Sequence, residues 1–242
     1  MKYLTFYLRE FLFPHGCGVC GQVLFEKEEA YYGLCAECRA FLSAALNIEK
    51  RCSICGKDLI SERDTCLSCR SPEGNTRYSQ HIVKLKSIFP YTGKFKDVLG
   101  AFKFRKSLGV GNFFVDCLNH TLENFEKEEI KNAVWVPVPP RPGKMKKQGW
   151  DQVEYLAKRL KKSSQLPFSR CLKRLPSRSQ KELNREEREK NLEGRIICSR
   201  MPPKNAILFD DVITTGVTLN ACAAALLKGG AEKVFGICLF YD

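Results

Sequence analysis

The run Ile207 to Asn220, ILFDDVITTGVTLN, places two adjacent aspartates directly after an apolar stretch. The neighbouring carboxylates of Asp210 and Asp211 can accept hydrogen bonds from a pair of vicinal hydroxyls. The Thr-Thr-Gly turn that follows leads into a helix-like segment, and backbone N–H groups at a helix N-terminus bind phosphate. A surface turn with an aspartate N-cap would explain one acid and one threonine, but not the whole run. The run therefore predicts a site for a phosphorylated sugar with free hydroxyls.

Eight of the thirteen cysteines form four Cys-x-x-Cys pairs near the start of the chain. This spacing is typical of zinc knuckles, and a glycine follows the second cysteine in two of the pairs. Four thiolates on each ion leave no open coordination position, which predicts two structural zinc sites. Sequential sites are favoured over a cross-braced arrangement, because each sequential pair encloses a short loop. The predicted ligands are Cys17, Cys20, Cys35, Cys38, Cys52, Cys55, Cys66 and Cys69.

The charge of the chain is concentrated in one segment. The formal net charge is +13, and the range 141–204 carries 19 Lys and Arg against 7 Asp and Glu. Such a concentration favours a polyanionic ligand, either nucleic acid or a phosphorylated small molecule. The alternative is a solvated, charged loop region. The sequence contains no GxxxxGK[ST] motif, which argues against a nucleotide-hydrolysing P-loop.

The elements that must position the aspartates follow from the hydrophobic pattern. We expect strands at 82–91, 133–140, 205–211 and 233–240, and helical periodicity over 93–122, 150–162 and 218–230. Alternating strands and helices with nearly continuous apolar strands predict an α/β fold with a parallel sheet flanked by helices. Ligands bind beyond the carboxyl ends of such strands, where Asp210 and Asp211 are expected.

The same pattern predicts the domain organisation. Residues 1–75 should form an amphipathic helix and a small double zinc-ribbon module, and residues 76–242 the α/β domain, with a polar linker near 71–80. The apolar N-terminal stretch is too short and too charged to span a membrane. We therefore expect a cytoplasmic protein that is not an integral membrane protein.

Several motifs resemble known families. ILFDDVITTGVTL resembles the phosphoribosyl pyrophosphate (PRPP) signature of type I phosphoribosyltransferases. The segments VPVPPRPGKMKKQGWDQVEYLAKRL, KRLPSRSQKELNREEREKNLEG and YTGKFKDVLGAFKFR look like blocks of the ComF family. With the cysteine-rich start, the resemblance covers nearly the whole chain. It implies a double zinc ribbon followed by a type I phosphoribosyltransferase-like domain, in a family associated with natural competence and the handling of transforming single-stranded DNA.

The resemblance also implies roles for individual residues. Asp210 and Asp211 would hold the ribose hydroxyls of PRPP or a similar sugar phosphate. The 5′-phosphate would lie on the turn formed by Val212, Ile213, Thr214, Thr215, Gly216 and Thr218. A basic flexible loop, 141–195, would close over the pyrophosphate, and Mg²⁺ would arrive with that group. The residues implied there are Pro139, Arg141, Lys144, Lys147, Gln180, Arg185, Arg188 and Asn191.

Two departures from the family patterns leave the chemistry open. Gln148 stands where the ComF block has arginine, and Thr214 stands where purine salvage enzymes of this fold often have an aspartate base. A transferase acting in nucleotide metabolism or salvage is therefore one interpretation, with no acceptor identified.

The competing interpretations use the same residues without catalysis. A basic groove with aromatic side chains can bind single-stranded DNA, through Arg141, Lys146, Lys147, Trp150 and Arg178. In a third interpretation the chain is an adaptor that presents the zinc ribbons to a competence helicase or an uptake pore.

Overall fold

The computed structural model describes residues 15–70, 81–176, 192 and 194–242. The predicted N-terminal helix, the linker over 71–80, and Arg178, Gln180, Arg185, Arg188 and Asn191 lie outside the described residues. Within the described part, no helix is long and apolar enough to cross a membrane.

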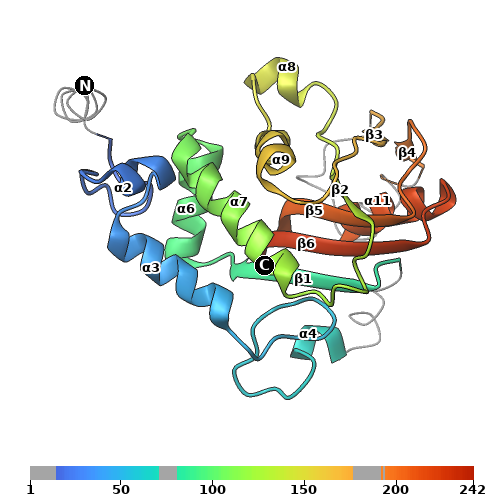
Figure 1. The fold of residues 1–242 in the computed structure, drawn as a ribbon, viewed down its shortest axis with the longest axis horizontal. Helices are drawn as coiled ribbons and strands as arrows, with labels where there is room; N and C mark the ends of the chain where they lie inside the picture. The colour runs from blue at the N-terminus through green and yellow to red at the C-terminus, as the bar shows by residue number, and fades with distance from the viewer. Residues whose placement is uncertain (1–14, 71–80, 177–191, 193) are drawn as a thin grey trace.

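A four-stranded parallel sheet forms the centre of the chain (Figure 1). Its strand order is β1-β6-β5-β2, and the strands run over Lys84–Pro90 (β1), Ala133–Pro137 (β2), Asn205–Ile213 (β5) and Lys233–Tyr241 (β6). The two central strands, β5 and β6, are buried along almost their whole length. This burial explains their nearly continuous apolar sequences and confirms the predicted α/β class.

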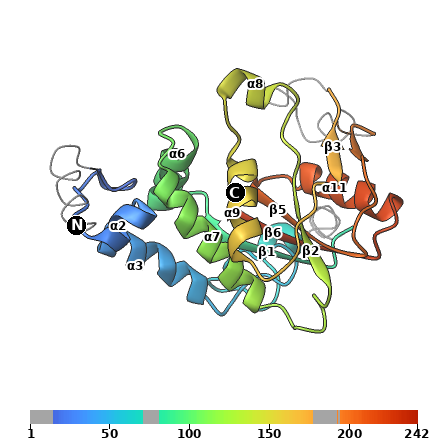
Figure 2. The same ribbon diagram turned by 45° about the horizontal axis from the view of Figure 1, so that its top comes forward.

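Helices and ribbons cover both faces of the sheet (Figures 1 and 2). One face packs against α6 (Gly93–Lys103), α7 (Leu108–Glu123) and α9 (Gln152–Ser163). The other face packs against α11 (Val217–Lys228) and a short antiparallel pair, β3 (Leu172–Arg174) and β4 (Ile196–Cys198).

The cysteine-rich part adds short helices: α2 (Lys27–Tyr32), α3 (Ala36–Ala44), a 3₁₀ turn η1 (Ala45–Asn47) and α4 (Leu67–Arg70). The cysteines of the first ribbon belong to the core on the α7 face, and those of the second ribbon to the core on the α11 face. The ribbons therefore share their hydrophobic cores with the α/β body, although they occupy a separate stretch of the sequence.

Several element boundaries differ from the sequence-based expectations, and three of the differences are instructive. The helical pattern over 93–122 is divided into α6 and α7 by a turn in which Lys106 has a φ of 53°. Strand β5 continues past the aspartates to Ile213, because Val212 and Ile213 pair with Phe240 and Tyr241 of β6. Helix α11 begins at Val217, one residue earlier than predicted.

The described part of the range 141–195 is not a single loop. It contains the short helix α8 (Lys144–Gln148), then α9 and β3. Helix α9 forms because the side chain of Asp151 caps it by accepting a hydrogen bond from the N–H of Glu154, and because Val153, Leu156, Ala157 and Leu160 form a buried stripe.

Candidate zinc and sugar-phosphate sites

The eight predicted zinc ligands form two groups of four, in the sequential arrangement. In each group all four sulfurs lie within 4.8 Å of one another. Thiolates on one tetrahedral zinc would lie about 3.8 Å apart, given Zn–S bonds of about 2.3 Å. Cys20 Sγ and Cys35 Sγ are 3.7 Å apart, and Cys55 Sγ and Cys66 Sγ are 3.8 Å apart. Both groups therefore fit structural zinc.

Backbone amides support both zinc groups. The N–H groups of Val19 and Cys38 donate to Cys17 Sγ and Cys35 Sγ, and the N–H of Cys66 donates to Cys52 Sγ. Such N–H···S bonds stabilise a thiolate. The hydrogen bond between Cys69 and Cys55 lowers the pKa of Cys55 to about 6 and raises the pKa of Cys69, so Cys55 is the more readily deprotonated of the two.

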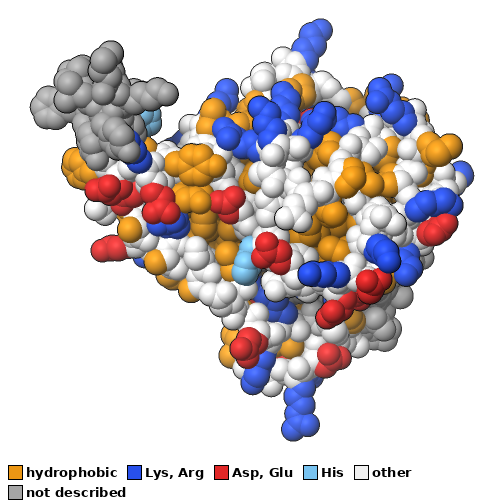
Figure 3. Space-filling view, viewed as in Figure 1, with side chains coloured by type: hydrophobic (Ala, Val, Ile, Leu, Met, Phe, Trp, Pro, Cys, Tyr) orange, Lys and Arg blue, Asp and Glu red, His pale blue; other side chains and the backbone are white. Residues whose placement is uncertain are grey.

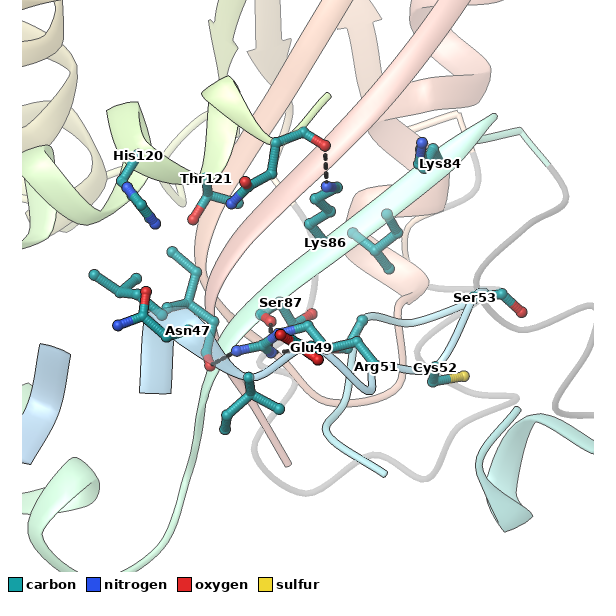
Figure 4. A pocket seen from close by; sticks show the side chains of 16 residues that line it. Asn47, Glu49, Arg51, Cys52, Ser53, Lys84, Lys86, Ser87, His120 and Thr121 are labelled. Atoms are coloured by element: carbon teal, nitrogen blue, oxygen red, sulfur yellow. Dashed lines mark hydrogen bonds between the residues drawn. The ribbon is translucent and has the colours of Figure 1, made fainter. Parts of the chain in front are cut away.

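The second ribbon is fixed to the edge of the sheet by a half-buried arginine. Arg51 donates to four carbonyl oxygens, those of Ala45, Gly56, Ser87 and Ile88. Figure 4 shows Arg51 and Ser87 side by side in a cavity of about 590 Å³ between the ribbon and β1. Gly56 has a φ of 74°, and a Cβ there would lie 2.4 Å from the Ser87 nitrogen, so only glycine allows this approach. The knuckle glycine thus has a packing role as well as a turn role.

A second cavity, of about 610 Å³, lies beyond the carboxyl ends of β2 and β5. This is the position at which parallel sheets bind ligands. The lining residues come from α6, the segment after β2, α8, α9, β3, β5 and α11. Those predicted from the sequence are Pro139, Arg141, Lys144, Lys147, Asp210, Asp211, Val212, Thr214 and Thr218. Ile213, Thr215, Gly216 and Lys146 do not line it.

The two aspartates occupy different environments within this cavity. Asp211 is buried, and its Oδ2 lies 2.7 Å from Lys103 Nζ and accepts a hydrogen bond from Gln152 Nε2. Burial alone would raise the pKa of Asp211, but the Lys103 ammonium holds that pKa below its ordinary value. Asp210 shows the opposite shift: removal from water and the adjacent charge of Asp211 raise its pKa well above 3.8. The pair therefore combines one ionised carboxylate with one that readily holds a proton.

The N-terminus of α11 supplies backbone donors at the same cavity. Its N-cap is Gly216, with a φ of 74°, which has no side chain with which to cap the helix. Uncapped N–H groups in the first turn of a helix attract anions. Thr218 of that first turn lines the cavity, next to Thr214 of the preceding turn. This end of the cavity suits a phosphate group.

The basic side chains near the cavity divide into two groups. Lys144 is half-buried and pairs with Asp151 at 2.5 Å, so its charge is already neutralised within the protein. Arg141, Lys146 and Lys147 are exposed. In Figure 3, Lys and Arg side chains gather along the upper part of the molecule, over the region of α8 and α9 labelled in Figure 1. This surface can attract a polyanion.

Trp150 contributes mainly to packing. Its ring is half-buried and meets the rings of Phe102 and Tyr155 edge to face, at centroid distances of 5.3 and 6.2 Å. Only part of this ring remains available to stack on a base.

The residues of the cavity that were not assigned from the sequence include Lys103, Asp151, Gln152 and Arg174. Lys103, Gln152 and Arg174 each fall within a segment that resembles a ComF block, so the resemblance itself contained a signal for them. An aspartate near the start of a helical pattern is a typical N-cap residue, and the side chain of Asp151 caps α9.

Comparisons with known proteins agree with this architecture. Residues 8–71 match the family described as Double zinc ribbon domain. The chain is 28% identical over 210 residues to competence protein ComFC of Bacillus subtilis, covering 85% of this chain and 83% of that protein. It is 26% identical to competence protein ComFC of Streptococcus pneumoniae, covering 83% and 84% of the two chains. It is 24% identical to competence protein F of Haemophilus influenzae, covering 84% and 87%. With two Cys₄ groups ahead of a parallel α/β sheet, the chain is similar over most of its length to competence proteins of the ComFC type.

Proposed function

We propose that this chain acts in natural competence by binding a phosphorylated ribose, PRPP or a close analogue, together with Mg²⁺ and single-stranded DNA. The relatives with which it aligns over most of its length are named competence proteins. The sugar-phosphate part of the proposal depends on one observation. Asp210, Asp211 and the uncapped N-terminus of α11 all border the same 610 Å³ cavity.

The cavity offers a partner for each part of such a ligand. The carboxylates can accept hydrogen bonds from the 2′ and 3′ hydroxyls, and the first turn of α11 can bind the 5′-phosphate. Mg²⁺ would be held mainly by phosphate oxygens and water, and would neutralise the charge that the ligand brings toward Asp210 and Asp211. Because Lys103 and Gln152 already bind Asp211, the ligand would share or displace those contacts.

Single-stranded DNA would follow the exposed cations Arg141, Lys146 and Lys147. Two of these, Arg141 and Lys147, also line the cavity. The proposed DNA surface and the proposed sugar-phosphate site are therefore adjacent, and the two ligands should influence each other's binding.

Calorimetry with PRPP and Mg²⁺ tests the sugar-phosphate site. We expect Asp210→Asn combined with Asp211→Asn to weaken binding at least tenfold, which corresponds to about 1.4 kcal/mol. Asp97→Asn, an exposed aspartate on α6, is the matched control and should bind like the wild type. Equal affinity of the double variant and the wild type would refute the site. Release of pyrophosphate when a base is added would extend the proposal to a transferase.

A further inference from the structure

Two cysteines outside the zinc groups lie together where β3 pairs with β4. Cys171 directly precedes β3, and Cys198 is the last residue of β4. The N–H and the hydroxyl of Ser199 both donate to the carbonyl oxygen of Cys171, at 2.7 and 3.1 Å. Leu172 stands directly opposite Cys198 in the antiparallel ladder, and the thiol groups of Cys171 and Cys198 interact with each other. The fold therefore brings together two thiols that are far apart in the sequence.

The backbone at this point suits a disulfide between the two cysteines. Residues on adjacent strands that are offset by one position have Cα atoms about 6 Å apart, within the range that a disulfide spans. In a regular strand Cys171 and Leu172 would point to opposite faces, but both are buried, and the alternation of buried and exposed side chains begins only at Leu172 and Lys173. The side chain of Cys171 therefore turns inward.

Cys198 is the accessible member of the pair. It is half-buried, whereas Cys171 is fully buried. The thiol of Cys198 donates a hydrogen bond of 3.2 Å to the carbonyl oxygen of Ala225 on α11, and it lies at the wall of a cavity of about 520 Å³ between β4 and α11. The exposed side chain of Lys228 belongs to the same wall. A small anionic disulfide can reach Cys198 through this cavity, and the Lys228 ammonium can pair with one of its carboxylates.

We propose that Cys171 and Cys198 form a reversible disulfide by exchange with a low-molecular-weight disulfide of the glutathione class. The bond would join the two ends of the stretch 172–197 and would fix β3, whose last residue, Arg174, lines the 610 Å³ cavity. The redox state of a pool of small thiols would thereby act on one wall of that cavity. The proposal does not depend on which ligand the cavity binds.

The exchange consists of two balanced steps. The Cys198 thiol gives up its proton, its sulfur attacks one sulfur of the small disulfide, and the departing thiolate takes up a proton to become a free thiol. The Cys171 sulfur then attacks Cys198 in the mixed disulfide and releases the second small thiol in the same way. Two protein thiols are oxidised, and one small disulfide is reduced to two thiols. Burial raises the pKa of both cysteines, so the exchange should be slower than at an exposed thiol.

Peptide mapping of the zinc-loaded full chain tests the pair. After incubation with oxidised glutathione, we expect trypsin to release one cross-linked species that contains the peptides Cys171–Lys173 and Ile196–Arg200, each with a single cysteine. Dithiothreitol should remove the cross-link. Elemental analysis should still give two zinc ions per chain, which would show that the zinc thiolates did not react.

Three variants distinguish a pair from two separate thiols. Cys198→Ser should abolish the cross-link and leave Cys171 unmodified, because the accessible nucleophile is gone. Cys171→Ser should stop the reaction after the first step, with one glutathione on Cys198. Cys117→Ser removes a buried cysteine of the other core and should form the cross-link like the wild type.

The thermal midpoint gives a second measurement. The cross-link restricts the unfolded chain, so oxidised glutathione should raise the midpoint of the wild type by several degrees. The midpoint of Cys198→Ser should not respond to the same treatment. An equal rise in this variant would show that the stabilisation has another origin and would overturn the proposal.

The mapping itself has three outcomes that contradict the proposal. The first is a wild-type chain that keeps two zinc ions and forms no link between Cys171 and Cys198. The second is a link from Cys198 to another cysteine, such as the neighbouring Cys222 on α11, or a mixed disulfide on Cys198 that Cys171 never displaces. The third is a cross-link that forms only as zinc is lost, because the reaction would then belong to a disrupted fold.

Discussion

Lys103 is the last residue of α6, and its Nζ lies 2.7 Å from Oδ2 of Asp211, near the end of β5. This ion pair joins a helix on one face of the sheet to the strand that carries the paired aspartates. The lysine holds the pKa of Asp211 below its ordinary value despite burial, so it keeps this carboxylate ionised beside Asp210.

Replacing Lys103 by Met should therefore destabilise the protein. We expect a loss of about 1.5–3 kcal/mol in the free energy of unfolding near neutral pH, the range for hydrogen bonds to charged groups. The pKa of Asp211 is lower in the folded protein than its ordinary value of 3.8. The ion pair therefore stabilises the folded state fully above pH 3.8, and this stabilisation is lost as the pH falls through the folded-state pKa. Urea unfolding at several pH values should show the two proteins converging in acid. Lys96→Met, an exposed control on the same helix, should change stability by less than about 1 kcal/mol.

Asp210 should show the opposite pH dependence. Its pKa is raised in the folded state, so the folded protein keeps a proton that the unfolded chain loses above pH 3.8. Stability should therefore fall as the pH rises from 3.8 toward the folded-state pKa. Asp210→Asn removes this penalty while keeping the acceptor for the N–H of Asp211. We expect the variant to be more stable than the wild type at pH 7 and equal to it near pH 3. A difference that does not vary with pH would contradict the assignment.

The zinc sites should stabilise the α/β body as well as the ribbons, because their cysteines belong to the two shared cores. We expect two zinc ions per chain in the wild type and one in Cys17→Ser or Cys52→Ser, measured by elemental analysis. Each loss should lower the thermal midpoint of the whole chain, since structural zinc supplies folding free energy. Cys198→Ser changes a half-buried cysteine outside both groups and should leave the zinc content at two. A midpoint of the α/β body that is insensitive to zinc would contradict the shared-core description.

Arg51 should contribute far more to stability than a surface arginine. Its four carbonyl acceptors connect the second ribbon to β1, and Arg51→Met would leave them without this donor. We expect a loss of about 2–4 kcal/mol in the free energy of unfolding. Arg39→Met removes an exposed pair with Glu28 and should cost less than about 1 kcal/mol. Similar losses for the two variants would show that Arg51 does not fix the ribbon to the sheet.

Single-stranded DNA should bind through the exposed lysines of α8, and its affinity should fall steeply with salt. For each of Lys146 and Lys147 that contacts a phosphate, substitution by Gln should reduce the slope of log affinity against log salt by about 0.7. Fluorescence anisotropy with a labelled oligonucleotide measures this slope. Lys127→Gln with Lys131→Gln removes two exposed charges that precede β2, at the opposite end of that strand from the cavity. An equal reduction by this control pair would argue against a localised DNA surface.

The sequence by itself determined the features that depend on local chemistry. Cysteine spacing predicted both zinc groups, because a Cys-x-x-Cys turn brings two sulfurs together within a few residues. Apolar runs predicted the strands of the sheet, since buried parallel strands must be apolar on both faces. The Asp-Asp and Thr-Thr-Gly run was predicted to meet a helix N-terminus, and α11 begins directly after it.

Only the tertiary structure decided how these parts are paired. Lys103 reaches Asp211, and Arg51 reaches β1, because packing of helices and ribbons on the sheet brings together residues that are far apart in the chain. Within 141–176 the sequence predicted the helix that becomes α9, but it did not predict the short helix α8 or the strand β3. Arg174 was one of many cations in that segment. The position of β3 over the cavity buries Arg174. It also leaves the Nε and Nη2 atoms of Arg174 without a hydrogen-bond partner among the described residues.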